Sequence, residues 1–502
     1  MNLRAYSSTV FFFMMLMVPM FASSQQAPRI TEVYVPNSPL VSFRVVVRSG
    51  SINDPAGKEG LNALTATMIG QGGSRSLSYQ QIVDKLYPWA ARIRVQADKE
   101  ETTIIGEVHR DHLQEFFGIF WELIASPRFD SDDFARNKDE QINYLKNTLR
   151  GNDDENLGKE GLNLLMYTNH PYRTAVEGTV QGLNSITLDD VRAFHHAMYS
   201  QSRIIFGIAG GYPKAFIEQV KKGLADLPLG SFTEVALPNP VPPVGVEGMI
   251  IQKENRATAI SFGYPIDVTR ADKDYYALLV ANSYLGEHRT FNGVLMNHLR
   301  GDRGLNYGDY SYIENFIQDG GSTFPDPNIP RREQFFSVWI RPVEPKNAQF
   351  AIRAAMHEVQ LLVDNGLTKE DFETTRNFLI NYSKLWVQTQ SRRLGYVMDS
   401  QFYGIPYYVD YVAQQLSALT VDEVNAAIKK HLQAKNYYLS IVAKDAGPLK
   451  EALLSNAPSP IQYNNPNVPA EILEQDKVIQ SLTVNINKEK FRIVPSSELF
   501  EK

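Results

Sequence analysis

The chain has 502 residues, of which 43% are hydrophobic and 21% charged, and a formal net charge of −6. These proportions are ordinary for a globular protein, and the length leaves room for two or more domains with their own cores. The acidic balance and the lack of a basic block argue against nucleic acid as a partner. Because the sequence contains no cysteine, it excludes disulfides, thiolate metal sites and cysteine nucleophiles.

Residues 1–24 have the features of a secretory signal peptide. Arg4 gives a positively charged start, residues 10–18 are apolar, and residues 22–24 are small, as a cleavage site requires. The apolar run is shorter than the ~20 residues that span a bilayer. The sequence therefore predicts export to a periplasm and no membrane contact after the signal is removed. An uncleaved membrane anchor is the alternative.

Hydrophobic patterning predicts both strands and helices in the first half of the chain. Four segments have the alternation or the β-branched content of strands: residues 40–48, 92–97, 102–108 and 203–211. Three segments have the apolar spacing of helices: residues 63–68, 112–124 and 134–149.

A proline-rich stretch over residues 237–245 contains four prolines and predicts a stiff, extended linker. Beyond it the order of elements restarts, with expected strands and helices at residues 260–264, 275–285, 334–340, 348–364 and 437–443. This weak repeat of element order predicts two similar domains, over residues 25–236 and 246–445. The tail, residues 446–502, is expected to pack on a domain surface or on a partner.

Several short strings support a family resemblance through their order and spacing. They are the helix at residues 60–68 with its glycine-containing approach, Asn169-His170-Pro171-Tyr172, Gly178-Thr179, residues 186–191 and Gly210-Gly211. Over residues 30–445 this arrangement resembles the M16 metallopeptidases, which include pitrilysin, insulin-degrading enzyme and mitochondrial processing peptidase. The resemblance implies an α+β fold of two homologous domains, each a mostly antiparallel sheet with packed helices, which together form half of a clam shell.

In M16 peptidases the first of these helices carries His-x-x-Glu-His, but here the three positions are Ala63, Ala66 and Thr67. Positions i, i+3 and i+4 share one face of a helix, so two histidines there would converge on zinc. The glutamate would activate the zinc-bound water. The residues present can neither hold the metal nor take a proton from water. The resemblance thus implies the fold of a peptidase without its catalysis.

The family's third metal ligand is a glutamate ~80 residues downstream on a second helix. By position this ligand falls on Asn143 or its neighbour Tyr144, and neither is a carboxylate. The family's accompanying acidic residue would fall at residues 136–137, which are arginine and asparagine. Asp139 and Glu140 lie nearby, so a shifted ligand stays open.

In the second half, Arg300 and Tyr307 match an Arg-x6-Tyr pair that in M16 enzymes faces the zinc across the closed chamber and helps to hold substrate. A guanidinium can donate to a peptide carbonyl, and a phenol can donate to a developing oxyanion. Arg303 competes for the arginine role. The alternative is that Arg300 is a solvated helix-end residue and Tyr307 a core strand residue.

Other candidate residues give weaker signals. His170 is expected to be a structural loop histidine, and the adjacent His195 and His196 cannot both face one metal well. Arg331 and Arg332 add local positive charge, and solvation is the expected state of both.

These observations predict a non-catalytic, substrate-binding subunit of an exported, heterodimeric M16B-type zinc peptidase. Zinc is expected in the partner subunit and none in this chain, and the substrate would be a peptide or an unfolded polypeptide. Arg300 and Tyr307 would complete the partner's active chamber. One alternative is a stand-alone peptide-binding or scaffold protein, and another is a peptidase with relocated metal ligands.

Overall fold

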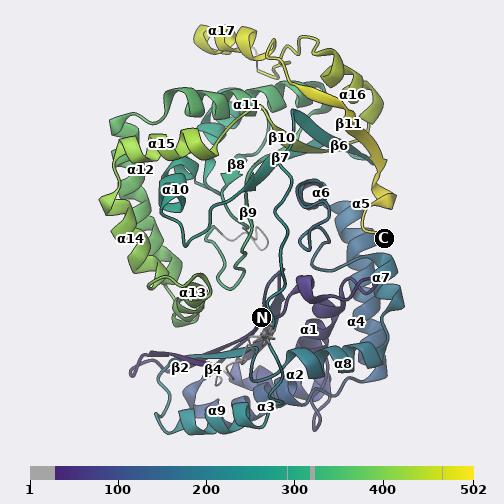
Figure 1. The fold of residues 1–502 in the computed structure, drawn as a ribbon, viewed down its shortest axis with the longest axis vertical. Helices are drawn as coiled ribbons and strands as arrows, with labels where there is room; N and C mark the ends of the chain where they lie inside the picture. Colours follow the sequence, from purple (N-terminus) through teal and green to yellow (C-terminus); the bar gives the residue numbers. More distant parts are fainter. Residues whose placement is uncertain (1–28, 291, 317–322, 466) are drawn as a thin grey trace, which may run out of the picture.

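The computed structural model describes residues 29–290, 292–316, 323–465 and 467–502. The predicted signal peptide, residues 1–24, lies outside the described residues. The chain folds into two halves stacked one above the other, each built on a mixed β-sheet with helices packed around it (Figure 1). Within the described part of the chain, no helix is both long and apolar enough to cross a membrane.

The first half contains a five-stranded sheet in the order β1-β5-β2-β4-β3. Its strands are β1 (Arg29–Tyr34), β2 (Leu40–Val47), β3 (Arg92–Ala97), β4 (Thr102–His109) and β5 (Ile204–Gly210). β1 pairs with β5 in parallel, and the other pairings are antiparallel. The four strands predicted from β-branched content and alternation are all present. β2, β4 and β5 are buried along most of their length, and β3 pairs with β4 at the edge of the sheet.

The helices of the first half include all three that the apolar spacing predicted. They are α1 (Leu61–Gln71), α2 (Tyr79–Leu86), α3 (Leu113–Ala125), α4 (Ser131–Asn143), α5 (Arg150–Asn152), α6 (Asp154–Met166), α7 (Val180–Ser185), α8 (Leu188–Met198) and α9 (Phe216–Ala225). α4 continues into a π-helical turn over Tyr144–Leu149. On one face of the sheet, Phe43 packs against Phe116 and Phe120 of α3 and Phe216 of α9.

The second half contains a six-stranded sheet in the order β11-β6-β10-β7-β9-β8. Its strands are β6 (Val246–Gln252), β7 (Thr258–Ile266), β8 (Asp309–Tyr312), β9 (Gln334–Val343), β10 (Tyr437–Ala443) and β11 (Ile486–Pro495). β6 pairs in parallel with both β10 and β11, and the remaining pairings are antiparallel. The tail therefore does more than pack on a surface, since β11 is an edge strand of the sheet itself.

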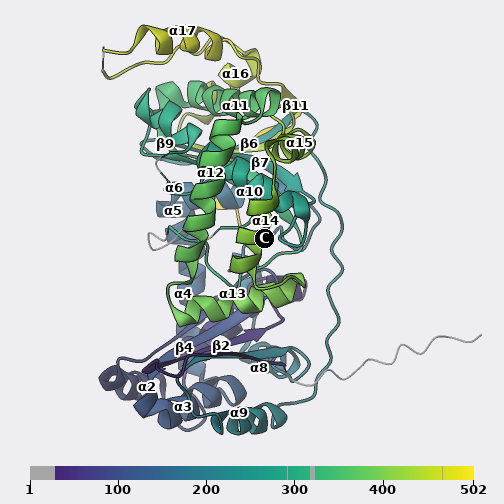
Figure 2. The same cartoon turned by 90° about the vertical axis from the view of Figure 1, so that its left-hand side faces the viewer.

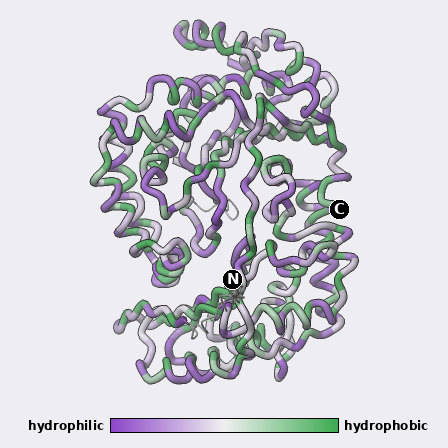
Figure 3. Tube along the Cα trace, viewed as in Figure 1, coloured by the Kyte–Doolittle hydropathy of each residue, from purple (hydrophilic) through white to green (hydrophobic). Residues whose placement is uncertain are grey.

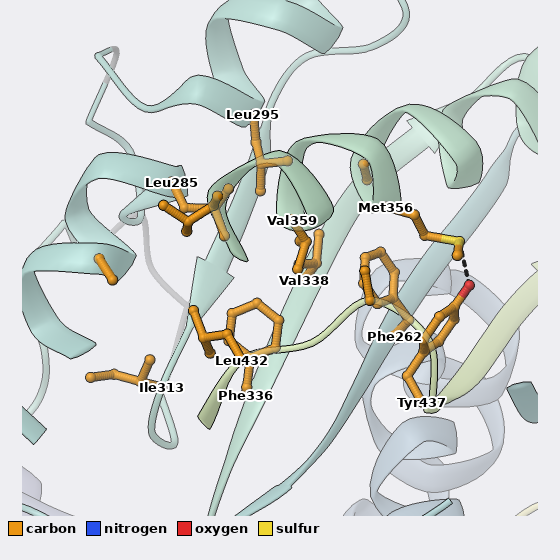
Figure 4. Packing of buried hydrophobic residues seen from close by; sticks show 14 of the residues in the cluster. Phe262, Leu285, Leu295, Ile313, Phe336, Val338, Met356, Val359, Leu432 and Tyr437 are labelled. Atoms are coloured by element: carbon orange, nitrogen blue, oxygen red, sulfur yellow. Dashed lines mark hydrogen bonds between the residues drawn. The ribbon is translucent and has the colours of Figure 1, made fainter. Parts of the chain in front are cut away.

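The helices of the second half are α10 (Lys273–Gly286), α11 (Ala348–Asn365), α12 (Lys369–Tyr382), α13 (Gln390–Tyr403), α14 (Tyr408–Ala418), α15 (Val421–His431), α16 (Ala446–Ser455) and α17 (Ala470–Ile479). Its core lies between the sheet and α11, where Phe262 and Val338 face Met356 and Val359 (Figure 4). The Tyr437 hydroxyl donates to the Met356 sulfur. Hydrophobic stretches are seen in both halves when the trace is coloured by hydropathy (Figure 3).

The two halves exchange helices. α6 belongs to the first half in sequence but packs on β7 and β10 of the second sheet, where a Cβ on Gly161 would lie 2.5 Å from Ser440 Oγ. In return, α13 packs on β1, β2 and β5 of the first sheet (Figures 1 and 2). The linker, residues 237–245, is extended as predicted and runs along one side of the molecule (Figure 2). Each sheet is therefore covered on one face by the other half's helix.

The C-terminal residues also join the two halves. The backbone N–H groups of Val180 and Gln181 donate to the carbonyls of Phe500 and Glu501, each at 2.9 Å. Arg150 donates to the Ser497 carbonyl at 2.7 Å and pairs with the Glu501 carboxylate at 2.9 Å. The chain thus ends on the first half after supplying a strand to the second.

Candidate functional site

A cavity of about 240 Å³ lies between α1, α4 and β3. All three degenerate positions of α1 line it, as their shared helix face predicted. Its full lining is Ala63, Ala66, Thr67, Gln71, Val95, Ala97, Asn137, Glu140, Gln141, Tyr144, Val176 and Glu177. The positions expected at a metal site therefore do lie together, but their side chains are not those of metal ligands.

Asn143 is exposed and does not line this cavity. Tyr144, named as its alternative, does line it, because Tyr144 follows Asn137 by seven residues and so lies on the same helix face. Asn137 also lines the cavity, whereas the Arg136 guanidinium donates to the Gln71 carbonyl at 2.7 Å. At the place expected for the third metal ligand, the cavity is thus lined by the phenol of Tyr144.

The residues around the cavity do not fit a zinc ion. Zinc in proteins takes thiolate, imidazole or carboxylate ligands, and two methyl groups, a hydroxyl and a phenol stand at the expected positions. Glu140, considered above as a shifted ligand, pairs with Arg136 at 3.5 Å and is more than half exposed. Among the described residues no group of three or more His, Cys, Asp or Glu could hold a metal.

The wall formed by α1 is held at its N-terminus by hydrogen bonds. Asp54 accepts from the backbone N–H groups of Gly60 at 2.8 Å and Asn62 at 2.7 Å, and burial raises the pKa of its carboxyl to about 7. The Gln141 amide donates to the carbonyls of Gly60 at 3.2 Å and Glu177 at 2.8 Å. Gly60 has a φ of +102°, and a Cβ there would lie 2.5 Å from the Glu177 carbonyl oxygen.

Arg300 and Tyr307 lie together on the second half. Arg300 is in the π-helical turn Met296–Gly301, and Tyr307 is in the loop before β8. The Arg300 guanidinium is 5.0 Å from the centre of the Tyr307 ring, and that of Arg341 is 5.4 Å from it. Tyr307 is 71% exposed, so it is not the core strand residue of the alternative interpretation.

Arg303, the competitor for the arginine role, is buried and committed to structure. Its Nε donates to Asp476 Oδ1 of α17 at 2.8 Å, and its Nη1 donates to the His298 carbonyl at 2.8 Å. Only 5% of its surface is exposed. It therefore cannot reach a substrate, and Arg300 remains the arginine that accompanies Tyr307.

Arg341 connects this pair to the first half of the molecule. It forms an ion pair with Glu155 of α6 at 3.1 Å, and its guanidinium is 5.7 Å from the Trp339 ring centre. Sequence reasoning did not single out Arg341. Its contact with Glu155 depends on the position of α6 beside β9, which no local pattern predicts.

The expectation that Arg331 and Arg332 are solvated is wrong. Arg331 is 4% exposed and donates through Nε and Nη2 to Asp98 at 3.2 and 2.8 Å. Arg332 donates to both Glu100 oxygens at 2.9 and 3.1 Å. Both acids lie more than 200 residues away in sequence, at the end of β3, so no local pattern could reveal them.

The histidines have structural environments. His170 accepts from the Tyr172 backbone N–H at 3.0 Å through Nδ1, and burial lowers the pKa of its imidazole to about 4. His195 Nε2 lies 2.8 Å from the Ile124 carbonyl oxygen, whereas His196 is exposed. These two adjacent side chains point to different surroundings, as the helix geometry predicted.

Two family models match the chain. The insulinase model of peptidase family M16 matches residues 29–180, and the model of the peptidase M16 inactive domain matches residues 185–379. The chain belongs to peptidase family M16. Its two mixed α+β halves are those of the family.

Relatives of this M16 chain carry contrasting names. The uncharacterized zinc protease YmxG of Bacillus subtilis is 21% identical over 405 residues, which cover 80% of this chain and 93% of that protein. The non-peptidase homolog YmxG of Helicobacter pylori is 20% identical over 407 residues, which cover 81% of this chain and 89% of that protein.

Solved structures show the same fold. A peptidase M16 inactive domain from Pseudomonas fluorescens aligns with a TM-score of 0.73 and 21% identity, covering 84% of this chain and 96% of that one. A Helicobacter pylori protease aligns with a TM-score of 0.70 and 16% identity, covering 83% and 99%. With alanines and threonine on α1, this chain is an inactive M16 homologue.

Proposed function

We propose that this M16 chain is the non-catalytic, substrate-binding subunit of an exported, heterodimeric M16B-type zinc peptidase. The observation that carries the proposal is a contrast between two sites. The cavity beside α1 has no metal ligand at positions 63, 66, 67 or 144, while Arg300 and Tyr307 are adjacent and accessible. In this proposal a partner subunit supplies zinc and the general base, and this chain closes the chamber.

The arrangement around Tyr307 suits a role toward developing negative charge. Its phenol is exposed, and two guanidinium groups lie within 5.4 Å of its ring. A phenol hydroxyl can donate to an oxyanion, and nearby fixed cations stabilise the charge that develops in the transition state. Because Arg341 is itself held by Glu155, this cation is positioned before substrate arrives.

An edge strand supports binding of an extended substrate. In the described chain β3 pairs with β4 alone, and it borders the cavity through Val95 and Ala97. A peptide can add to such an edge through main-chain hydrogen bonds. The Gln96 amide donates to the carbonyls of Pro327 and Asn328, so the second half reaches the end of this edge.

The test is reconstitution with a zinc-bearing M16 subunit. Adding this chain should raise hydrolysis of an unfolded polypeptide, and Arg300→Ala or Tyr307→Phe should diminish that gain by ~10²–10³-fold, as removal of an oxyanion donor does. Tyr87→Phe is the matched control, because Tyr87 is 86% exposed on the first half. Equal hydrolysis by the partner subunit alone would exclude the proposal.

The alternative function is a stand-alone peptide-binding or scaffold protein. The wall formed by α1 is compatible with this alternative, because its N-terminus is held by Asp54 and it carries no metal ligand. Size-exclusion chromatography distinguishes the two functions. Co-elution with the zinc-bearing subunit favours the paired enzyme, whereas a homodimer that ignores that subunit favours the scaffold. Fractionation of cells that express the full chain tests export.

A further inference from the structure

The tail helix α17 contacts the chain segment that follows Arg300. α17 lies at the end of the second half that faces away from the first, where it packs on α11 (Figure 1). Its Asp476 accepts from Arg303 Nε at 2.8 Å, and its Gln475 accepts from Arg303 Nη2 at 3.1 Å. The Tyr463 hydroxyl donates to the second oxygen of the Asp476 carboxylate. Arg303 and Asp476 are 5% and 6% exposed, so the tail forms a buried ion pair three residues beyond Arg300.

Arg303 connects this ion pair to the backbone of the π-helical turn. Its Nη1 donates to the His298 carbonyl at 2.8 Å, and the backbone N–H of Gly304 donates to the Arg300 carbonyl at 2.8 Å. π-Helical turns are rare and frequently occur at functional sites. One guanidinium thus joins α17 to the backbone that leads from Arg300 to Tyr307.

A second arginine holds α17 from α11. Arg353 is fully buried, and its Nη1 donates to the Ala457 carbonyl at 2.9 Å and to Ser459 Oγ at 2.7 Å. The same group donates to the carbonyl of Gln480, the residue at the C-terminal cap of α17. A cation there is stabilising because it lies at the negative end of the helix dipole. α17 is thus held near its middle by Arg303 and at its end by Arg353.

The contact between Arg303 and Asp476 suits the fixing of geometry better than a gain in stability. Removing two charges from water costs about as much as their attraction returns, so a buried ion pair contributes little net stability. A guanidinium and a carboxylate nevertheless define both a distance and a direction, because their hydrogen bonds are charge-assisted and the guanidinium is planar. Asp476 accepts through both of its oxygens, from Arg303 and from Tyr463, so its own position is determined as well.

We propose that Asp476 is a positioning residue for Arg300 and Tyr307 and acts on them through Arg303. The tail, residues 446–502, then sets the place of the substrate-binding pair from beyond the two predicted domains. The inference rests on the proposed function of that pair, and it adds that the pair works only while α17 is docked. It gives the tail a role beyond packing on a surface.

Amide hydrogen exchange of the full chain, without a partner subunit, tests the positioning itself. Asp476→Asn keeps the shape of the side chain but removes its charge, so Arg303 loses its ionic partner. The fragment that spans residues 299–306 should then exchange at least ~10-fold faster, because the N–H of Gly304 is released more often from the Arg300 carbonyl. Asp476→Glu keeps the carboxylate and should restore slow exchange.

A milder variant covers the case in which Asp476→Asn does not fold. Tyr463→Phe removes only the hydroxyl that donates to Asp476 and leaves the ion pair with Arg303. Exchange of residues 299–306 should rise in the same direction, by about two- to tenfold, as expected for the loss of one hydrogen bond.

Glu501→Gln is the matched control in the same tail. It removes the charge that pairs with Arg150 at 2.9 Å on the first half, and it leaves Arg303 and Asp476 as they are. Exchange of residues 299–306 should stay at the parent rate in this variant. A general loosening of the tail would raise exchange in both variants, so the comparison separates positioning from loss of stability.

Partner-dependent hydrolysis tests the consequence for the proposed site. With a zinc-bearing M16 subunit present, Asp476→Asn should lower kcat roughly 10- to 100-fold, because a displacement of about 1 Å can cost that much. In the Arg300→Ala, Tyr307→Phe double variant the same substitution should change the residual kcat less than about twofold, because the groups that it positions are already removed. A merely structural defect would lower kcat by the same factor in both backgrounds.

Two outcomes overturn the inference and leave the proposed function intact. They are parent-like exchange of residues 299–306 in Asp476→Asn, or in Tyr463→Phe where that variant is used, and an unchanged kcat in Asp476→Asn while Tyr307→Phe lowers it. A third outcome, an unchanged kcat in Tyr307→Phe as well, overturns the proposed function and the inference with it. The failures are distinguishable because the exchange measurement needs no partner subunit.

Discussion

The two halves of this M16 chain share an architecture but differ in what they present to solvent. In the first half the face that would hold zinc is buried and lined by methyl groups and a phenol, with Ala63 8% and Ala66 1% exposed. In the second half Tyr307 is 71% exposed beside two guanidinium groups. An exposed aromatic ring among cations contributes little to folding, which is one reason for our proposal that Tyr307 acts in binding.

If Arg300 and Tyr307 bind substrate as proposed, loss of catalysis and loss of function are separable in one fold. The first half keeps the frame around the vanished site, including the Asp54 contacts to α1 and the Gln141 bridge between Gly60 and Glu177. The second half keeps groups that could act on a substrate. If the first half is only structural, it should hold a metal tightly only when all of the missing metal ligands are restored.

Complete restoration gives the largest expected effect. The variant Ala63→His, Ala66→Glu, Thr67→His should bind zinc at least ~100-fold more weakly than the same variant with Tyr144→Glu added, because the third ligand is then present. Hydrolysis should be absent without the fourth substitution. Metal analysis after dialysis measures the difference. The matched control uses Asn143→Glu as the fourth substitution, because Asn143 does not line the cavity. Tight zinc binding by this control would show that the cavity-facing side of the helix is assigned wrongly.

The next effect distinguishes the structural role of Arg303 from the proposed binding role of Arg300. Arg303→Ala should lower the free energy of unfolding by about 3–5 kcal/mol, because it leaves Asp476 buried without its partner. Arg300→Ala should change stability by less than about 1 kcal/mol and act on partner-dependent hydrolysis instead. Urea unfolding of both variants gives the comparison. Equal destabilisation by the two changes would remove the distinction between a structural and a functional arginine.

Sequence reasoning located most of the secondary structure and one face of the site. Local patterns were enough to predict β2, the β3–β4 pair and α1, because alternation and helical spacing depend only on residues that are close in sequence. The convergence of Ala63, Ala66 and Thr67 followed from helix geometry alone. The sequence left the distal position between Asn143 and Tyr144, which differ by about 100° around the helix, and of these two only Tyr144 lines the cavity.

What sequence could not show depends on contacts between distant segments. The Arg331–Asp98 pair joins residues of different halves, so solvation was the wrong expectation for Arg331. The exchange of α6 and α13 between sheets and the addition of β11 to the second sheet have no local signal. The contact of Arg303 with Asp476 joins residues 173 apart in sequence, and a linear motif could not have predicted it.

A smaller effect concerns the pH dependence of stability beside Tyr307. Asp309 starts β8 and accepts from the Asn306 amide at 2.6 Å, and burial raises the pKa of its carboxyl to about 8. The folded chain therefore keeps a proton that the unfolded chain releases above pH ~4, so the unfolding free energy falls as pH rises from ~4 to ~8. Asp309→Asn removes this loss. Between pH 5 and pH 8 the variant should gain about 1–3 kcal/mol relative to the parent chain, and parallel pH profiles would contradict the assignment.

The smallest expected effect tests the contrast between the buried face of α1 in the first half and the exposed Tyr307 in the second. Tyr307→Phe should change the free energy of unfolding by no more than about 0.5 kcal/mol, because the side chain is exposed and keeps its ring close to Arg300 and Arg341. Ala66→Leu in the first half should cost more, about 1–3 kcal/mol, unless the adjoining cavity accepts the larger side chain. Thermal unfolding of both variants measures this pair of values. A stability loss at Tyr307 as large as that at Ala66 would mean that Tyr307 is held by the fold, and the argument that its exposure serves a substrate would fail.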